Sequence, residues 1–205
     1  MTDRVYNVLF LCTGNSARSI LAESILQKDG AGRFRAFSAG SQPKGEVNPL
    51  ALRTLRGWDY PAEGFRSKGW EEFAAPGAPV MDFVFMVCDS AAGEACPIWP
   101  GHPTTAHLGI EDPATVEGTE IDKLRAFNAA FRYMKTRISL FTALPLKSLD
   151  DMALGSKLRD IGRSEGTTSP APDACCIPET PQGVCCLRKA ELPAGAPCCG
   201  HGAAA

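Results

Sequence analysis

The chain has 205 residues, of which 44% are hydrophobic and 21% are charged, and its formal net charge at pH 7 is −2. This length and composition suffice for one α/β domain of about 150 residues with its own hydrophobic core. Lysines and arginines are scattered rather than clustered, so the charge gives no support for binding to nucleic acid or to an acidic membrane surface.

The beginning of the chain and its cysteines indicate a cytoplasmic protein. Residues 1–4 lead directly into a predicted strand without a hydrophobic export segment, and no apolar stretch approaches the length of a membrane span. In a reducing compartment, nine cysteines are expected to serve catalysis or ligand binding rather than a framework of disulfides.

The first predicted elements are a buried strand at residues 6–11 and a helix at residues 17–29. Residues 12–19, which connect this strand to the helix and include the first helical turn, read Cys-Thr-Gly-Asn-Ser-Ala-Arg-Ser. Gly14 and Asn15 permit a tight turn in which successive backbone N–H groups point inward, and the helix adds the positive end of its dipole. The sequence therefore predicts a pocket for an oxyanion, bound by Thr13, Gly14, Asn15, Ser16, Ala17 and Arg18.

Cys12 is the candidate nucleophile at the floor of this pocket. The guanidinium of Arg18 can bind two oxygens of an anion, and the hydroxyl of Ser19 can donate to the Cys12 sulfur. A free cysteine titrates near ~8.5, and such surroundings lower its pKa by one to several units. We therefore expect Cys12 to be an ionised nucleophile at neutral pH. The alternative is a buried cysteine that happens to precede an arginine.

The next elements alternate between strand and helix. We predict a short strand at residues 35–38 and a helix that Asn48 caps, Pro49 begins and Gly57 ends. A short helical segment follows at residues 68–74.

A second buried strand is predicted at residues 83–87, and it ends on Cys88. Because ligands gather outside the carboxyl ends of parallel strands, Cys88 is expected on the same edge of the sheet as Cys12. Two thiols would then flank one oxyanion. Cys96 follows after seven residues, and inert buried cysteine is the alternative for both positions.

A candidate general acid follows the strand predicted at residues 105–108. Proline fixes its own φ and biases the preceding residue toward extended geometry, so a loop can hold the carboxyl of Asp112, in Asp112-Pro113, over the mouth of the pocket. An ordinary turn is the alternative. No aromatic residue follows in the segment 114–116, which suits a small inorganic oxyanion better than a phenyl phosphate.

Two helices complete the predicted elements. Residues 120–143 carry apolar side chains at steps of three and four, which form a stripe that faces the core, and residues 149–161 form one more short helix. Strands that are separated by helices imply an α/β fold, in which helices cover both faces of a parallel sheet.

The C-terminal part of the chain differs in composition. We divide the chain into a domain at residues 1–147, a helical extension at 148–164 and a disordered tail at 165–205, because the tail is rich in proline and poor in apolar residues. Adjacent thiolates suit a soft metal or metalloid ion. A further redox relay and a tail without function are the alternatives. Six cysteines form three adjacent pairs there: Cys175 and Cys176, Cys185 and Cys186, Cys198 and Cys199.

Residues 5–145 resemble the low-molecular-weight protein tyrosine phosphatases and, on the same fold, the arsenate reductases that couple to thioredoxin or glutaredoxin. The resemblance rests on the Cys-x5-Arg-Ser motif that begins at Cys12 and on the dipeptide Asp112-Pro113. In both groups the first motif holds a tetrahedral oxyanion and the aspartate is the general acid. The resemblance implies a three-layer α/β/α architecture with a four-stranded parallel sheet.

The additional cysteines favour the reductases, because a phosphatase needs no second thiol. The reductases place a resolving cysteine at the position of Cys88 and a shuttling cysteine near that of Cys96, although one residue more separates the two here. The resemblance implies reduction of arsenate to arsenite for arsenic detoxification, with Cys12 as nucleophile and thioredoxin, glutaredoxin or glutathione as reductant. The alternatives are a phosphatase that hydrolyses phosphate monoesters through Cys12 and a non-enzymatic metalloid buffer that relies on the tail.

The resemblance implies no required cofactor beyond the external thiol reductant. Glu23 and Ser38 match positions that help to bind potassium in some of the arsenate reductases, whereas a glutamate on an exposed helix face is ordinarily only solvated. Trivalent arsenic, the product of the implied reaction, is a thiophilic species that the cysteine pairs of the tail would suit.

Overall fold

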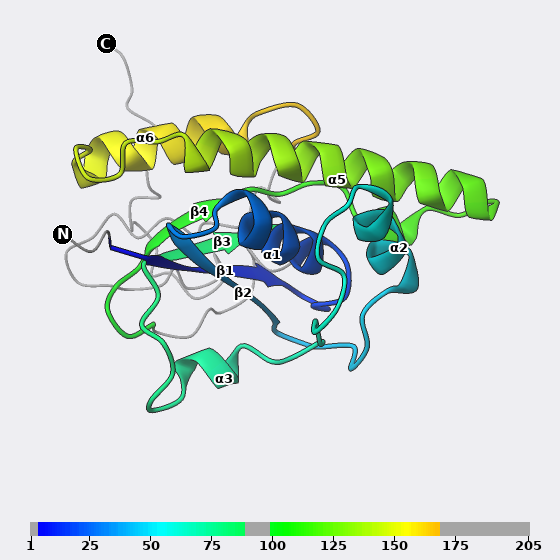
Figure 1. The fold of residues 1–205 in the computed structure, drawn as a ribbon, viewed down its shortest axis with the longest axis horizontal. Helices are drawn as coiled ribbons and strands as arrows, with labels where there is room; N and C mark the ends of the chain where they lie inside the picture. The colour runs from blue at the N-terminus through cyan, green and yellow to red at the C-terminus, as the bar shows by residue number, and fades with distance from the viewer. Residues whose placement is uncertain (1–3, 89–98, 169–205) are drawn as a thin grey trace, which may run out of the picture.

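Four parallel strands form the centre of the structure, a computed structural model that describes residues 4–88 and 99–168 (Figure 1). The strands lie in the order β2-β1-β3-β4, so the predicted parallel α/β fold is confirmed. Their bounds are Tyr6–Cys12 for β1, Phe34–Gly40 for β2, Phe83–Met86 for β3 and Thr104–His107 for β4.

The helices cover the two faces of the sheet unequally (Figure 1). Within the described residues, one face carries four helices, and the other carries the short helix α3 (Glu71–Ala74). None of the described helices is long and apolar enough to cross a membrane. The four helices on the first face are α1 (Arg18–Asp29), α2 (Pro49–Gly57), α5 (Glu120–Thr142) and α6 (Asp151–Gly162).

Helix α3 is shorter than the predicted segment 68–74. The backbone before it pairs with the end of β2 instead: Gly40 N–H donates to Lys68 O at 2.9 Å, and Trp70 N–H donates to Gly40 O at 3.0 Å. These bonds compete with helical ones, so the helix begins only at Glu71.

Strand β1 is buried on both faces, as its continuous apolar sequence predicts. Val8 and Phe10 pack on the side of α1 and α5, whereas Leu9 and Leu11 pack on the opposite side with Phe73 of α3. All four strand residues have an exposed fraction of zero. The core therefore fixes β1 firmly, and with it the position of the chain that leaves its end.

The carboxyl ends of β1 and β3 lie side by side. Leu11 pairs with Met86, and Val87 N–H donates to Leu11 O at 2.9 Å. Cys12 and Cys88 therefore follow at the same edge of the sheet, as predicted from the parallel arrangement.

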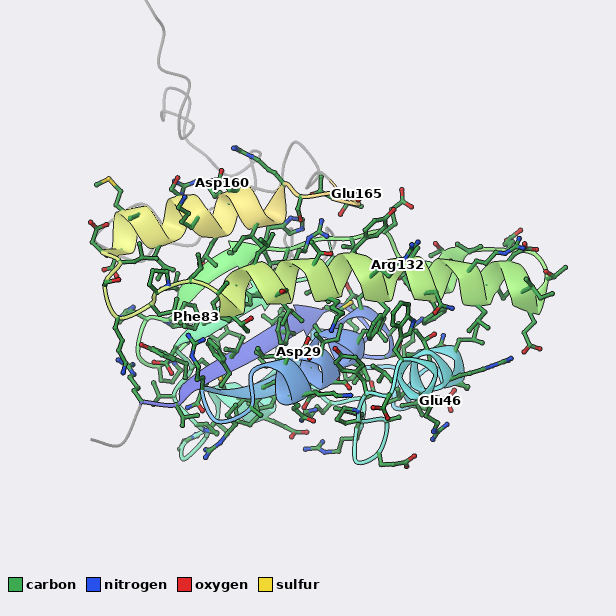
Figure 2. All side chains as sticks on the ribbon, turned by 45° about the horizontal axis from the view of Figure 1, so that its top comes forward. Asp29, Glu46, Phe83, Arg132, Asp160 and Glu165 are labelled. Carbon is green, nitrogen blue, oxygen red and sulfur yellow. The ribbon has the colours of Figure 1, made fainter. Side chains whose placement is uncertain are left out.

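The end of the described chain packs back onto the body. Helix α6 lies against α5 and β4, and Figure 2 shows Asp160 on α6 and Glu165 just beyond its end. The side chain of Arg137, on α5, is fully buried. It donates to the carbonyl oxygens of Glu165 at 3.1 Å, Ser164 at 3.3 Å and Gly109 at 3.4 Å. Arg137 thus ties the chain after α6 to the loop after β4.

A short antiparallel bridge joins the same two segments. Ile110 pairs with Thr167, and Thr168 N–H donates to Gly109 O at 3.3 Å. Residues 165–168, which we assigned to the tail from the sequence, are therefore in contact with the domain. The rest of the tail, residues 169–205 with its six cysteines, lies outside the described residues.

Candidate active site

The segment between β1 and α1 encloses one side of a cavity of about 420 Å³. The residues that line it come from this segment, from the chain after β2 and from the loop after β4. They are Cys12, Thr13, Gly14, Ser16, Ala17, Arg18, Gln42, Lys44 and Asp112. The structure therefore brings the candidate nucleophile, arginine and acid of the two sequence motifs into one cavity.

Asn15 supports this loop from behind and is not among the residues that line the cavity, so the anion contact that we predicted for it stays a prediction. It is fully buried, and its φ of 40° lies in the left-handed region. Its side-chain amide donates to Ser19 Oγ at 3.0 Å and to Ser38 Oγ at 2.8 Å, while its oxygen accepts from Lys68 N–H at 2.8 Å. These three bonds hold a conformation that few residues adopt.

Gly40, at the end of β2, allows the loop to approach the sheet. A Cβ atom at this position would lie 2.5 Å from Thr13 O, which is closer than real contacts of this kind. The neighbouring Gln42 N–H donates to Thr13 O at 2.9 Å. The oxyanion loop is therefore held by backbone bonds to the chain after β2 as well as by Asn15.

Cys88 lies beside the nucleophile. Cys12 and Cys88 are both buried thiols that form no disulfide, and Cys88 Sγ is 3.7 Å from the hydroxyl oxygen of Thr13, within hydrogen-bond distance for sulfur. The two thiols also interact directly, through a hydrogen bond between their side chains. The arrangement places a second thiol beside Cys12, although Cys88 is not one of the residues that line the cavity.

This pairing changes the protonation of Cys12. The hydrogen bond with Cys88 and burial raise the pKa of Cys12 well above its usual value, while Arg18 and the backbone N–H of Gly14 act to lower it. The prediction that Cys12 is a thiolate at neutral pH is therefore wrong for the reduced pair. It counted the groups that favour the thiolate and omitted the neighbouring thiol, which disfavours a second negative charge next to its own sulfur.

We expect the pKa of Cys12 to fall when Cys88 is replaced by Ala, because the largest cause of the upward shift is then removed. A lower pKa increases the thiolate fraction at pH 7 and so speeds alkylation of Cys12 by iodoacetamide. Because the chain has nine cysteines, the pKa of Cys12 is taken from the difference in thiolate absorbance against pH between each protein and the same protein with Cys12→Ser in addition. An unchanged or higher pKa of Cys12 in the Cys88→Ala protein would contradict the pairing.

Arg18 holds the candidate acid over the cavity. Its Nη2 donates to Asp112 Oδ2 at 2.8 Å and its Nη1 to Ile110 O at 3.0 Å, while Asp112 Oδ1 caps the following turn by accepting from Ala114 N–H at 3.0 Å. The turn is a short 3₁₀ helix, Pro113–Thr115. Nε of Arg18 is buried and has no hydrogen-bond partner in the parts of the chain that the structure describes. The guanidinium therefore spans from the loop to the acid, with Nε left for an anion.

The structure adds residues that we did not identify in the sequence. Lys44 lines the cavity and therefore adds a second cation to Arg18. Its side chain packs over Gly14, where a Cβ atom would lie 3.2 Å from it. Lys68 lies behind the loop with Glu23 and Ser38. In the sequence, Lys44 could have been found only as a basic residue that follows the end of a strand, β2.

Other predicted roles stay predictions. Ser19 is buried and accepts from Asn15, which leaves its own hydroxyl proton for another acceptor such as Cys12. Cys96 and the six tail cysteines lie outside the described residues.

The family model for low molecular weight phosphotyrosine protein phosphatase matches residues 7–150. The chain is 34% identical over 134 residues to the arsenate reductase of Oceanobacillus iheyensis, a match that covers 65% of this chain and 93% of the relative.

Solved structures give the same picture. A protein described as an arsenate reductase in the phosphate binding state aligns with a TM-score of 0.55 and 25% identity, over 68% of this chain and 98% of that one. The tyrosine phosphatase Wzb from Escherichia coli K30, in complex with sulphate, shares the fold with a TM-score of 0.55 and 19% identity, over 68% of this chain and 97% of that one.

Proposed function

This chain belongs to the low molecular weight phosphotyrosine protein phosphatase family, and we propose that it reduces arsenate to arsenite through a relay of thiols that starts at Cys12. Curated relatives at this level of identity are arsenate reductases, and the match covers nearly their whole length. The cavity suits the substrate, because the loop at the start of α1 lines it together with Arg18 and Lys44, which suits a small tetrahedral anion.

The observation that carries the proposal is the position of Cys88. Hydrolysis of a phosphate ester through Cys12 needs only water after the first step, whereas reduction of arsenic needs a second electron-donating thiol within reach. Cys88 is a buried thiol that forms no disulfide and is hydrogen bonded to Cys12. A thiol in that place supports reduction over hydrolysis.

The first step joins Cys12 to arsenic. An arsenate dianion held by the loop and by Arg18 is itself a base, so the Cys12 proton passes to one of its oxygens as the sulfur attacks. The S–As bond forms, one As–O bond breaks, and that oxygen leaves as water after Asp112 donates a proton to it. An anion that binds Nη2 of Arg18 takes this donor from Asp112, which frees the carboxyl to face the leaving oxygen.

The second step reduces arsenic. Cys88 attacks Cys12 Sγ, a disulfide forms between the two sulfurs, and the electron pair of the broken S–As bond stays on arsenic. Arsenic passes from the +5 to the +3 state and leaves as arsenite. One arsenate and two thiols thus give one arsenite, one disulfide and one water.

The cycle closes on an external thiol. Cys96 attacks Cys88, which leaves a disulfide between these two residues and restores the Cys12 thiol, and thioredoxin, glutaredoxin or glutathione reduces that disulfide. The relay needs thiols that begin reduced, and we place it in the cytoplasm, where such reductants keep cysteines reduced.

The test is a direct comparison of two activities in the full chain. Arsenite formation is measured with each thiol reductant, beside hydrolysis of p-nitrophenyl phosphate without reductant. The proposal requires repeated arsenate turnover with at least one reductant. Ester hydrolysis together with no arsenite formation would assign the chain to the phosphatases instead.

We further propose that the cysteine pairs of the tail retain the product, since thiolates replace the hydroxyl groups of arsenite with loss of water. A chain that ends after Thr168 keeps the bridge to Ile110 and should turn over arsenate like the full chain, while losing most bound arsenite, counted by mass spectrometry. The matched control ends after Gly162. It lacks the bridge and should lose turnover, because the loop that carries Asp112 is then unsupported.

Two results would contradict retention by the tail. One is a full chain that binds no arsenite with all thiols reduced. The other is a chain ending after Thr168 that loses turnover and regains it with a small dithiol, which would make the tail part of the relay.

A further inference from the structure

Behind the oxyanion loop, the structure encloses a pair of opposite charges that does not line the cavity. Glu23, on α1, and Lys68 each have a side-chain exposed fraction of 9%, and Lys68 Nζ lies 3.8 Å from Glu23 Oε2. The reaction proposed above uses neither side chain. A buried ion pair needs a reason, because the desolvation of two charges can exceed their mutual attraction.

Hydrogen bonds connect this pair to the loop. Ser38 Oγ donates to Glu23 Oε2 at 2.5 Å, and the Asn15 amide donates in turn to Ser38 Oγ at 2.8 Å. From the other side, Lys68 N–H donates to the Asn15 side-chain oxygen at 2.8 Å. Asn15, and with it the left-handed turn of the loop, is therefore connected to Glu23 through Ser38 and to the backbone of Lys68.

Each member of the pair keeps the other charged. Burial raises the pKa of Glu23, and Lys68 is the strongest of the groups that oppose this rise. Burial likewise lowers the pKa of Lys68, and Glu23 is the strongest group that opposes the fall. The nearby Arg66 and Glu72 pair with each other at the surface. Without its ammonium partner, the Glu23 carboxylate would be a buried, uncompensated charge.

The residues present do not fit the potassium ion that the resemblance implied at Glu23 and Ser38. The carboxylate already has a counter-charge at 3.8 Å, and the Asn15 side-chain oxygen is taken by a backbone N–H. The Ser38 hydroxyl proton is directed at Glu23. A second cation would lie next to an ammonium group in a buried environment, where like charges repel strongly.

We propose that the Lys68 ammonium is a built-in monovalent cation that neutralises Glu23 and thereby holds Asn15, and so the oxyanion loop, in its binding conformation. Lys68 is a positioning residue that acts through Glu23, Ser38 and Asn15. The proposal rests on the proposed function only in that the loop binds a tetrahedral oxyanion, which a reductase and a phosphatase share. It requires the loop to work without any dissociable cation.

The test measures binding of inorganic phosphate to the reduced full chain by calorimetry, in potassium chloride and in choline chloride at about 0.1 M, where ionic strength is matched. The wild type and a Lys28→Met control should bind equally in both salts, since Lys28 belongs to an exposed pair with Asp59. Lys68→Met should bind phosphate about tenfold or more weakly in choline chloride, because Glu23 is then unpaired. Potassium or ammonium ions, which are small enough to replace the lost group, should restore most of the affinity.

A second variant decides the case if Lys68→Met is too unstable to purify. Glu23→Gln combined with Lys68→Met removes both charges and should fold and bind phosphate independently of potassium. Three results would overturn the proposal: a wild type whose affinity depends on potassium, a Lys68→Met protein unaffected in choline chloride, or a double variant that does not bind phosphate. Failure to reduce arsenate leaves all these measurements intact, so the two proposals fail separately.

Discussion

In the Cys88→Ser variant, the steady-state rate of arsenate reduction with thioredoxin is expected to fall by roughly 10³-fold or more, as is typical when an essential reacting group is removed. Serine keeps the size of the side chain and cannot donate the electron pair that forms a disulfide. The arsenic adduct on Cys12 would then form, but the reaction would stop there because no thiol at position 88 can attack Cys12. Arsenite release is measured over many enzyme equivalents, and trapped adduct is detected as added mass on Cys12.

The same variant has a built-in control. Slow hydrolysis of p-nitrophenyl phosphate uses only the first half of the chemistry, so it should remain at or above the wild-type rate, because removal of Cys88 lowers the Cys12 pKa. A Cys12→Ser protein should lose both activities. Full arsenate turnover in the Cys88→Ser protein would exclude Cys88 from the relay, and loss of both activities would mean that Cys88 supports the loop rather than the reduction.

The Asp112→Asn variant is expected to slow both activities by roughly 10²–10⁴-fold, which is the usual contribution of a positioned proton donor. Asparagine has the size of aspartate but only one acceptor oxygen, which can still cap the turn at Ala114 N–H while the bond from Arg18 is lost. In the proposed reaction the bound anion takes that donor of Arg18, so the loop should keep its place. The loss should therefore appear in kcat rather than in KM. The measurement is the steady-state rate of each reaction at saturating substrate.

Asp59→Asn is the matched control for this change. Asp59 is fully exposed and pairs with Lys28, and neither residue lines the cavity, so its replacement should leave both rates unchanged. A loss below tenfold in the Asp112 variant would remove Asp112 from the role of proton donor.

Much of the fold could be predicted because its signals are local. The apolar run at residues 8–11 indicated a strand buried on both faces, and Asn48 indicated the start of α2 through its side-chain cap, which accepts from Leu50 N–H at 2.9 Å. The Cys-x5-Arg-Ser spacing placed Cys12 and Arg18 on one turn. Each of these signals lies within a few residues of the element that it specifies.

The parts of the site that could not be predicted depend on segments that are distant in the sequence. Arg18 binds Asp112 across 94 residues, and Asn15 binds the backbone of Lys68 across 53. The upward shift of the Cys12 pKa requires Cys88 as a hydrogen-bond partner, which spacing alone does not reveal. A pattern in one chain shows which groups are present, whereas their pairing is decided by packing.

The bridge between Ile110 and Thr167 fixes where the tail leaves the domain. Ile110 O also accepts from Arg18, which lines the cavity, so only Ile110 and Arg18 separate Thr167 from the cavity. Cys175 follows Thr168 by seven residues, and an extended chain of that length reaches at most ~25 Å. A covalent connection of this length sets an effective concentration on the order of millimolar. The retention of product that we propose for the tail thiols would therefore be governed by the length of the chain, and it would not change when the protein is diluted.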